Sequence, residues 1–455
     1  MGYERDELAT FDDWNTFRAG HPDLAALDVF VIDSNGNVLG KRIGIEDAGK
    51  VFKEGVQFSA CAPIADVRGV GHDPLGIGTS DGDPDGTAWP LRGTLCPMPW
   101  VAEPTAQVVC VMREFGSNAP LWFDPREVLR GVLARCAAAG LRPVVACELE
   151  FYLVGRERDA DGLVRIAPIP GQDRVPRRAT NLSLITVEEN AEFLRRITNV
   201  AKVQQLPVCG VLAEYGIGQY EVNLRHEADP LAAADHAVLL KRLVGGVARS
   251  MGVQATFMAK PFPDQAGSGL HVHVSLVDEA GRNRFGMAGG EALLERAIAG
   301  MQDLMFDSMA FFAPNFNSHR RYTGPFVPTA RHWAYNNRSV AFRVPAATGE
   351  ARRVEHRVAG ADASPHLVVA AVLAGVLHGI TQALQASKPV TGKVNDTRDP
   401  RFPDGVLAAL ERLRASKKLR GYVEPRYLEA FSLMKRGEYG ALMDRPFARE
   451  YDFYL

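Results

Sequence analysis

Several signatures by which nucleotide-binding or redox proteins are often identified are absent from this sequence. It contains no G-x-x-x-x-G-K-[ST] phosphate-binding loop, and no G-x-G-x-x-G segment opens a helix after a strand. Its six cysteines are widely spread and form no C-x-x-C pair, which argues against a zinc site or a disulfide framework and favours reduced, mostly buried thiols. Any bound nucleotide must therefore be held in another way.

Long apolar runs and an excess of charge of one sign are also missing. The most apolar stretch, 367–377, is too short to span a bilayer and is typical of a buried helix. The first residues are acidic without an apolar core, so we predict no signal peptide, no membrane partner and a cytoplasmic location. With 52 basic and 54 acidic residues, the net charge is −2 and the basic residues are scattered, so a nucleic-acid partner has no electrostatic support.

What is present is the composition of a folded globular protein, with 46% apolar and 23% charged residues in a chain of 455. One hydrophobic core seldom grows to this size, so we expect two domains of unequal size. The break lies near 116–127, because Asp124 as N-cap and Pro125 at the first helical position begin a helix. The predicted domains are residues 1–119 and 120–455.

The N-terminal domain is predicted to be rich in strands, with a hairpin turn at Asn35-Gly36 and a long irregular loop over 68–93, which is loaded with Gly, Asp and Pro. The strands expected in the chain cover 27–33, 37–43, 106–115, 142–153, 219–225, 254–260, 269–277, 339–345 and 352–358. The helices expected after the break cover 124–140, 187–205, 229–251, 290–312, 365–386, 404–415 and 424–437. Strands joined by long helical insertions predict an α+β domain.

Charged residues lie inside several of these strands, where alternate side chains share a face. One face is shared by Glu148 and Glu150, a second by His271, His273 and Ser275, and a third by Arg353, Glu355 and Arg357, while Glu214 precedes a glycine turn that leads to Glu221 on the next strand. Each strand thus offers an apolar face to a core and a charged face to something else. Unpaired buried charges are costly, so these charged faces should meet one another, metal ions or a polyanion.

The alternative is that these are solvent-exposed strand faces with ordinary charge pairs, which is the commoner explanation for any single pair. Solvent exposure explains less well why several strands of one domain each carry a charged face. Glutamates with a histidine suit Mg²⁺ or Mn²⁺ better than zinc, and nearby arginines suit phosphate. The combination indicates phosphoryl transfer.

The same residues carry a family resemblance in five ordered motifs. The motifs are ELEFYL (148–153), EYGIGQYE (214–221), GSGLHVHVSL (267–276), NSHRRY (317–322) followed by NNRSVAFRVP (336–345), and RRVEHR (352–357). On these motifs, the chain resembles the glutamine synthetase family over nearly its whole length. The resemblance implies an α+β fold with a small β-grasp-like N-terminal domain and a larger glutamine synthetase-type catalytic domain, built from a curved antiparallel sheet and helices.

The resemblance also implies ATP and two to three Mg²⁺ or Mn²⁺ ions in each site. The implied metal ligands are Glu150, Glu214 and Glu221 on the acceptor side, and Glu148, His271 and Glu355 on the side of the ATP phosphates. Arg338 would stabilise the transferring phosphoryl group, Arg343 and Arg353 the nucleotide phosphates, and His273 and Ser275 would line the nucleotide cleft. Arg321 and Arg357 would hold the substrate carboxylate beside the backbone of Gly267 and Gly269.

The assembly implied by the resemblance is a homo-dodecamer of two stacked hexameric rings. In that arrangement, the 60–90 loop of one subunit closes the site of the next, which makes Asp66 a candidate site residue.

Departures from the family pattern bear on both substrates. Glutamine synthetases carry a flap glutamate that helps to bind ammonium and remove its proton, whereas this chain has Val327 there, and an apolar residue cannot do this. The family's Asp-Gly-Ser-Ser loop is absent around Asp66, and its ammonium-pocket tyrosine has no evident match in 177–189. The asparagine that usually precedes Gly-Ser-Gly is replaced by Ala266, so a carboxylate other than glutamate stays open.

These features imply an ATP-dependent ligase of the γ-glutamylpolyamine or γ-glutamylputrescine synthetase type, which joins glutamate to an organic amine through an acyl phosphate. One alternative is an ammonia-using glutamine synthetase. A second is a non-catalytic structural relative, such as the one known from eye lens, against which the retention of all six matched ligands argues. An unrelated metallohydrolase would leave the arginines without a role.

Overall fold

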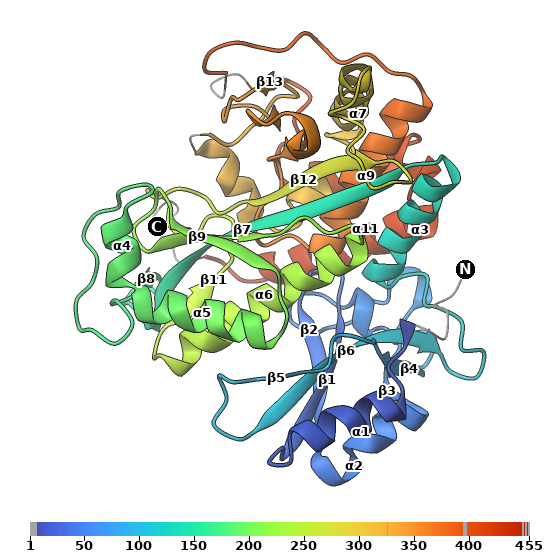
Figure 1. Cartoon of the computed structure of the whole chain (residues 1–455), viewed down its shortest axis with the longest axis vertical. Coiled ribbons are helices and arrows are strands. Elements are labelled where there is room, and N and C mark those ends of the chain that lie inside the picture. Colours follow the sequence, from blue (N-terminus) through green and yellow to red (C-terminus); the bar gives the residue numbers. More distant parts are fainter. Residues whose placement is uncertain (1–6, 325, 395–397, 448–449, 451–452, 454–455) are drawn as a thin grey trace.

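The computed structural model describes residues 7–324, 326–394, 398–447, 450 and 453. These residues form two β-sheets, of which the N-terminal one lies at one end of the molecule and the larger one, with most of the helices, at the other (Figure 1). No helix in these ranges is both long and apolar enough to cross a membrane.

The N-terminal sheet has the strand order β2-β1-β6-β4-β3, with β5 also paired to β6. Its strands are β1 (Ala26–Ile32), β2 (Val38–Gly44), β3 (Val56–Ser59), β4 (Asp85–Pro90), β5 (Cys96–Pro97) and β6 (Thr105–Glu114). The predicted hairpin at Asn35-Gly36 joins β1 to β2, and β1 runs parallel to β6. In the turn, the carboxylate of Asp33 accepts hydrogen bonds from the backbone N–H groups of Asn35 and Asn37 at 2.9 and 2.7 Å.

Two helices of this region were not predicted, namely α1 (Phe11–Gly20) and α2 (Ile45–Glu54). Helix α2 buries Ala48, Val51 and Phe52, a helical spacing that follows β2 without a break in the sequence. The expectation of an irregular loop over 68–93 is wrong at its end, because β4 pairs there with β3 and β6. Pairing with neighbouring strands outweighs the poor strand propensity of its Asp, Gly and Pro residues.

The larger sheet has the order β13-β14-β15-β12-β7-β10-β9, with β8 and β11 also paired to β7. Its strands are β7 (Arg142–Arg158), β8 (Val164–Ile166), β9 (Val208–Ala213), β10 (Gln219–Leu224), β11 (Gln254–Thr256), β12 (Leu270–Val277), β13 (Trp333–Tyr335), β14 (Phe342–Val344) and β15 (Val354–His356). Its pairs are antiparallel except β13 with β14, which are parallel. Strands β8, β9 and β13 were not predicted. The expected mainly antiparallel sheet is confirmed.

The helices of the larger region are α3 (Pro125–Ala138), α4 (Leu184–Glu189), α5 (Ala191–Val203), α6 (Pro230–Ser250), α7 (Gly290–Leu304), α8 (Met309–Phe312), α9 (Pro365–Thr381), α10 (Gly405–Ala415) and α11 (Pro425–Met443). The single helices expected over 187–205 and 290–312 are each divided in two. Helix α6 packs against β7 and α9 against β12. The predicted α+β architecture is confirmed, while the domain boundary at 119/120 stays a prediction.

The apolar and charged side chains of the central strands face opposite sides. Leu149 and Phe151 of β7 and Val272 and Val274 of β12 belong to the hydrophobic core. Because side chains alternate along a strand, the glutamates and histidines between them face away from this core.

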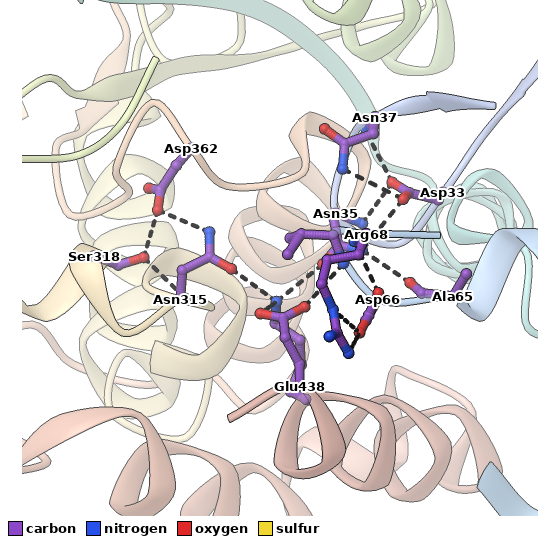
Figure 2. A network of polar contacts seen from close by, with 12 residues as sticks. Asp33, Asn35, Asn37, Ala65, Asp66, Arg68, Asn315, Ser318, Asp362 and Glu438 are labelled. Carbon is purple, nitrogen blue, oxygen red and sulfur yellow. Dashed lines mark hydrogen bonds and ion pairs between the residues drawn. The ribbon is translucent and has the colours of Figure 1, made fainter. Parts of the chain in front are cut away.

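A buried ammonium group joins the N-terminal region to the larger one, and its partners Asn35, Asn315 and Glu438 belong to the polar network that Figure 2 shows. The side chain of Lys435 on α11 is fully buried, and its Nζ donates to Oδ1 of Asn35 at 3.0 Å, to Oδ1 of Asn315 at 2.8 Å and to Oε1 of Glu438 at 2.7 Å. The other oxygen of Glu438 accepts a hydrogen bond from the backbone N–H of Val67 at 3.1 Å. Three acceptors satisfy all three donors of the ammonium group, so this charge is buried with its partners in place.

Candidate active site

Strand register brings the charged faces together on the larger sheet. The directly opposed pairs are Glu148 with His271, Glu150 with Glu221, and His273 with Glu355. They lie on the four adjacent strands β10, β7, β12 and β15. Residues that are far apart in the sequence are therefore neighbours, because consecutive strands of an antiparallel ladder place opposed side chains about 5 Å apart.

Among the described residues, two groups could hold a metal ion. One consists of Glu148, His271 and Glu355, and the other of Glu150, Glu221 and His271, with ligand atoms within 4.8 Å of one another in each. His271 belongs to both, since its Nδ1 lies 2.5 Å from Oε1 of Glu148 and its Nε2 lies 3.9 Å from Oε1 of Glu150. Carboxylate-rich donor sets of this kind fit Mg²⁺ or Mn²⁺.

The first group has the residues that the resemblance implies for the ATP side. The second differs from expectation, because His271 and not Glu214 completes it. Glu214 lies close by, and its carboxylate accepts a hydrogen bond from the backbone N–H of Tyr215 at 3.1 Å.

Excess negative charge marks the acceptor side of the site. Burial, followed by the nearby charge of Glu150, raises the pKa of Glu214 to about 7. Burial and then the charges of Glu148, Glu150 and Glu214 raise the pKa of Glu221 to about 10. A divalent cation would relieve this repulsion, so the electrostatics and the donor chemistry agree.

The carboxylates of the ATP side are instead held ionised by cations. Burial disfavours the charged form of Glu355, but the positive charge of Arg357 is the largest of the effects that lower its pKa to about 2. Arg343 donates to Glu355 at 2.6 Å, and Arg357 is also hydrogen-bonded to it. Burial likewise opposes ionisation of Glu148, yet hydrogen bonds with His271 and His273 bring its pKa well below the usual range.

A cavity of about 490 Å³ opens beside these groups. Of the predicted site residues, it is lined by Glu148, Glu214, Glu221, His273, Arg338, Arg343, Arg353 and Glu355. The carboxylates and the arginines thus border the same space, which combines cation-binding and phosphate-binding side chains.

His273 connects these two kinds of residue. Nε of Arg353 donates to Nδ1 of His273 at 3.2 Å, which leaves Nε2 of the ring as the donor to Glu148 at 3.1 Å. Ser275 is opposite Val144 on β7, is buried, and does not line the cavity.

Arg321 lies against the backbone at the predicted glycines. A Cβ atom on Gly269 would lie 2.8 Å from Nη2 of Arg321 and 2.8 Å from Nε2 of His271, and one on Gly267 would lie 2.6 Å from Cγ of Arg321. Only glycine permits this approach. Nη1 of Arg321 donates to the carbonyl of Val358 at 2.8 Å, while the buried Nε atoms of Arg321 and Arg357 have no hydrogen-bond partner within the described chain.

Nine of the predicted site residues do not line the cavity, namely Glu150, His271, Ser275, Gly267, Gly269, Arg321, Arg357, Asp66 and Val327, and the last two also lie apart from the acidic cluster and Arg321. Asp66 is fully buried, and its carboxylate accepts hydrogen bonds from Arg68, from the N–H of Val70 at 3.0 Å and from His72 at 2.8 Å. These contacts organise its own loop. Val327 is 6% exposed and packs in the core, whereas the neighbouring Phe326 is 41% exposed.

Sequence reasoning did not identify several residues that line the cavity, among them Asn181, Leu182, Cys209, Tyr215, Asn223 and His226. A signal existed for Asn223, which lies two positions after Glu221 and therefore on the same face of β10. Leu182 had no such signal, because it lies outside the predicted elements.

Comparisons with known proteins show the family to which the chain belongs. The family model for the glutamine synthetase catalytic domain matches residues 123–454. The γ-glutamylputrescine synthetase PuuA of Escherichia coli (strain K12) is 39% identical over 421 residues, which cover 92% of this chain and 89% of that protein. The glutamate–isopropylamine ligase of a Pseudomonas species is 30% identical over 415 residues, which cover 89% of each chain.

The fold is shared with a solved structure of a GmaS/ADP complex, at a TM-score of 0.81 and 22% identity over 96% of this chain and 98% of that one. Residues 123–454, which the family model matches, contain the carboxylate groups, the arginines and the glycine positions described above. As its motifs indicated, this chain belongs to the glutamine synthetase family.

Proposed function

We propose that this protein is an ATP-dependent carbon–nitrogen ligase that forms a γ-glutamyl amide from glutamate and an organic amine. The observation that carries the proposal is the cavity itself, in which Glu214 and Glu221 lie in the same lining as Arg338, Arg343 and Arg353. The 39% identity to a γ-glutamylputrescine synthetase and the 30% identity to a glutamate–isopropylamine ligase support an amine as the acceptor.

The two carboxylate groups are assigned to divalent cations, Mg²⁺ or Mn²⁺. Glu148, His271 and Glu355 would hold the ion on the ATP side, and Glu150 and Glu221, with Glu214 nearby, the ion on the acceptor side. Bound there, the ions would neutralise phosphate charge and polarise its oxygens. Arg338, Arg343 and Arg353 would contact the phosphates, because guanidinium groups match phosphate oxygens in geometry and charge.

Glutamate is assigned to the region around Arg321. The buried Nε atoms of Arg321 and Arg357 are donors without partners in the described chain, and guanidinium groups are suited to bind a carboxylate. Gly267 and Gly269 keep the adjoining backbone free of side chains, so a small amino acid can approach it closely.

The chemistry proceeds in two steps. An oxygen of the γ-carboxylate attacks the γ-phosphorus of ATP, the bond to the leaving ADP breaks, and an acyl phosphate forms. Arg338 offsets the charge that develops during this transfer. The amine nitrogen then attacks the acyl carbon, phosphate leaves, and Glu214 takes the proton that the nitrogen loses.

The deciding experiment is phosphate release from ATP, Mg²⁺ and glutamate, with ammonium compared against n-butylamine, isopropylamine, ethanolamine and putrescine. Release with an amine and not with ammonium supports the proposal. Release with ammonium alone identifies an ammonia-using glutamine synthetase and overturns it. Glu355→Ala should abolish the release, whereas Glu279→Ala, on a side chain that is 93% exposed, should leave it unchanged.

The assembly proposed here is a dodecamer of two hexameric rings, with the 60–90 loop at a subunit contact and domains divided at 119/120. The exposure of three apolar residues on this loop, Val67, Val70 and Leu75, supports a contact there. The mass in solution, measured by light scattering, tests the dodecamer directly.

A further inference from the structure

Three large side chains with apolar surface are exposed close to Glu214, on three separate segments of the chain. Leu182 is 64% exposed, Tyr215 56% and Phe326 41%. Leu182 and Tyr215 line the cavity that Glu214 also borders. We call these three residues the apolar rim.

One direct contact and two indirect ones connect the apolar rim to Glu214. The backbone N–H of Leu182 donates to the carbonyl of Ala213, the residue before Glu214, at 3.0 Å. The backbone N–H of Tyr215 donates to the carboxylate of Glu214 at 3.1 Å. The ring of Phe326 stacks on that of Tyr215, with centroids 5.9 Å apart and planes inclined by 26°.

Two members of the rim adopt a backbone conformation that bulky residues rarely take. The φ angle is +61° at Leu182 and +57° at Phe326, in the left-handed region where a Cβ atom is crowded. Neither side chain has the polar group by which Asn or Asp stabilises that conformation. Strain of this kind is retained where the surrounding structure holds a residue for a purpose, and such residues cluster at ligand sites.

A purely structural role explains the rim incompletely. Apolar side chains that stabilise the packing of two segments are normally buried between them. Each rim residue instead keeps two fifths or more of its surface exposed. Apolar surface that borders a polar cavity is typical of a ligand site, where apolar contacts fix the body of the ligand and a few polar groups fix its orientation.

Resting on the proposed ligase function, we propose that the apolar rim receives the carbon chain of a primary amine whose nitrogen lies at Glu214. Aromatic rings bury alkyl groups, and their faces attract the positive charge of an alkylammonium ion. Ammonium itself has no carbon chain and gains none of the alkyl contact. The rim therefore sets the preference of the enzyme for alkylamines over ammonium.

The test is a set of steady-state measurements on Phe326→Ala and Leu182→Ala with whichever amine of the panel the unaltered enzyme uses. The KM for that amine should rise about tenfold or more in each variant, since loss of apolar contact in a pocket has effects of this size. The KM values for glutamate and ATP should change less than about twofold. Phe326→Leu, which keeps a large apolar side chain, should recover much of the affinity for the amine.

Phe115→Ala is the matched control, because Phe115 is 73% exposed and does not line the cavity. It should leave every constant unchanged, and thermal unfolding should show that all variants are folded. If the unaltered enzyme uses no amine, the proposed function fails and this inference fails with it. If it uses amines but the rim variants keep their KM, or lose glutamate and amine affinity equally, the inference alone is overturned.

Discussion

Lys435 and Glu221 are both nearly inaccessible, with 1% and 7% of their surface exposed, but their surroundings differ in kind. The ammonium group of Lys435 has three oxygen acceptors within 3.0 Å, one of them the carboxylate of Glu438. Glu221 is surrounded by other carboxylates, which together with burial raise its pKa to about 10. The charge of Lys435 is neutralised by the fold itself, whereas Glu221 keeps a proton near neutral pH unless a cation takes the place of that proton.

The difference separates the framework from the site that it supports. The Lys435 contacts continue through Asn315, whose side chain donates to Asp362 at 2.9 Å, and Asp362 also accepts from Ser318 at 2.6 Å (Figure 2). Ser318 is the second residue of the short helical segment Asn317–Thr323, which also carries Arg321. The Lys435 network, in which the buried ammonium group has all its partners, therefore positions Arg321 beside the carboxylate cluster around Glu221. We expect substitutions in the network to lower stability and substitutions at the site to lower activity.

The largest effect is expected on catalysis, from Arg338→Ala. Arg338 lines the cavity, and its charge acts on Glu214. An arginine that stabilises a transferring phosphoryl group contributes on the order of 10³–10⁵ in kcat, so we expect a fall of that size with little change in stability. Arg320→Ala is the control, because Arg320 lies over the ring of Phe316 and does not border the cavity. A variant Arg338→Ala with more than about a tenth of normal kcat would remove this residue from the proposed mechanism.

The next effect is on stability, from Lys435→Met. Methionine fills much of the same volume but leaves Glu438 as a buried charge without its ammonium partner, and Asn35 and Asn315 as acceptors without a donor. Removing one member of a buried pair costs about 3–5 kcal/mol, which urea unfolding can measure.

The matched control for that variant is Lys418→Met. Lys418 also forms an ion pair, with Asp303 at 2.7 Å, but its side chain is 52% exposed. We expect a loss of less than about 1 kcal/mol there. Equal losses in the two variants would contradict the view that burial makes the Lys435 network structurally important.

Part of the acidic cluster could be predicted from local rules. Alternation along a strand places Glu148 and Glu150 on one face, and the same rule groups His271 with His273. The register that opposes Glu148 to His271 is not contained in either strand alone. It follows from long-range pairing, so the sequence indicated it only through the family resemblance.

The contacts of Asp66 and the burial of Val327 were not predicted from the sequence. That Asp66 borders the site of a neighbouring subunit stays a prediction; within its own chain, its partners lie two, four and six positions further along the same loop. That local pattern was present in the sequence, as Asp-x-Arg-x-Val-x-His, and was not recognised. Phe326, and not its neighbour Val327, is the exposed residue of this segment. Its ring stacks on that of Tyr215, which lies far away in the sequence, so local rules could not predict this contact.

The smallest expected effect is stabilisation by Mg²⁺. It tests most directly the difference between the Lys435 network and the carboxylate cluster around Glu221. A ligand present at a hundred times its Kd stabilises a folded protein by about 2.7 kcal/mol, so MgCl₂ should raise the Tm of chelator-treated protein. Glu221→Gln should remove most of this rise, because it deletes one ligand of the acceptor-side group. Lys418→Met should keep the full rise, since Lys418 lies on another part of the fold and pairs there with Asp303.

The pH dependence of this stabilisation has a definite sign. The pKa of Glu214 in the folded protein, about 7, lies above the value near 4.3 that is usual for glutamate. Between these values, the folded state holds a proton that the unfolded state has lost, so stability without metal falls as pH rises. A cation must displace that proton below pH 7 but meets a free carboxylate above it, so the Tm rise caused by Mg²⁺ should be larger at pH 8 than at pH 6. Equal rises at both pH values, or a full rise in Glu221→Gln, would show that the cation binds elsewhere.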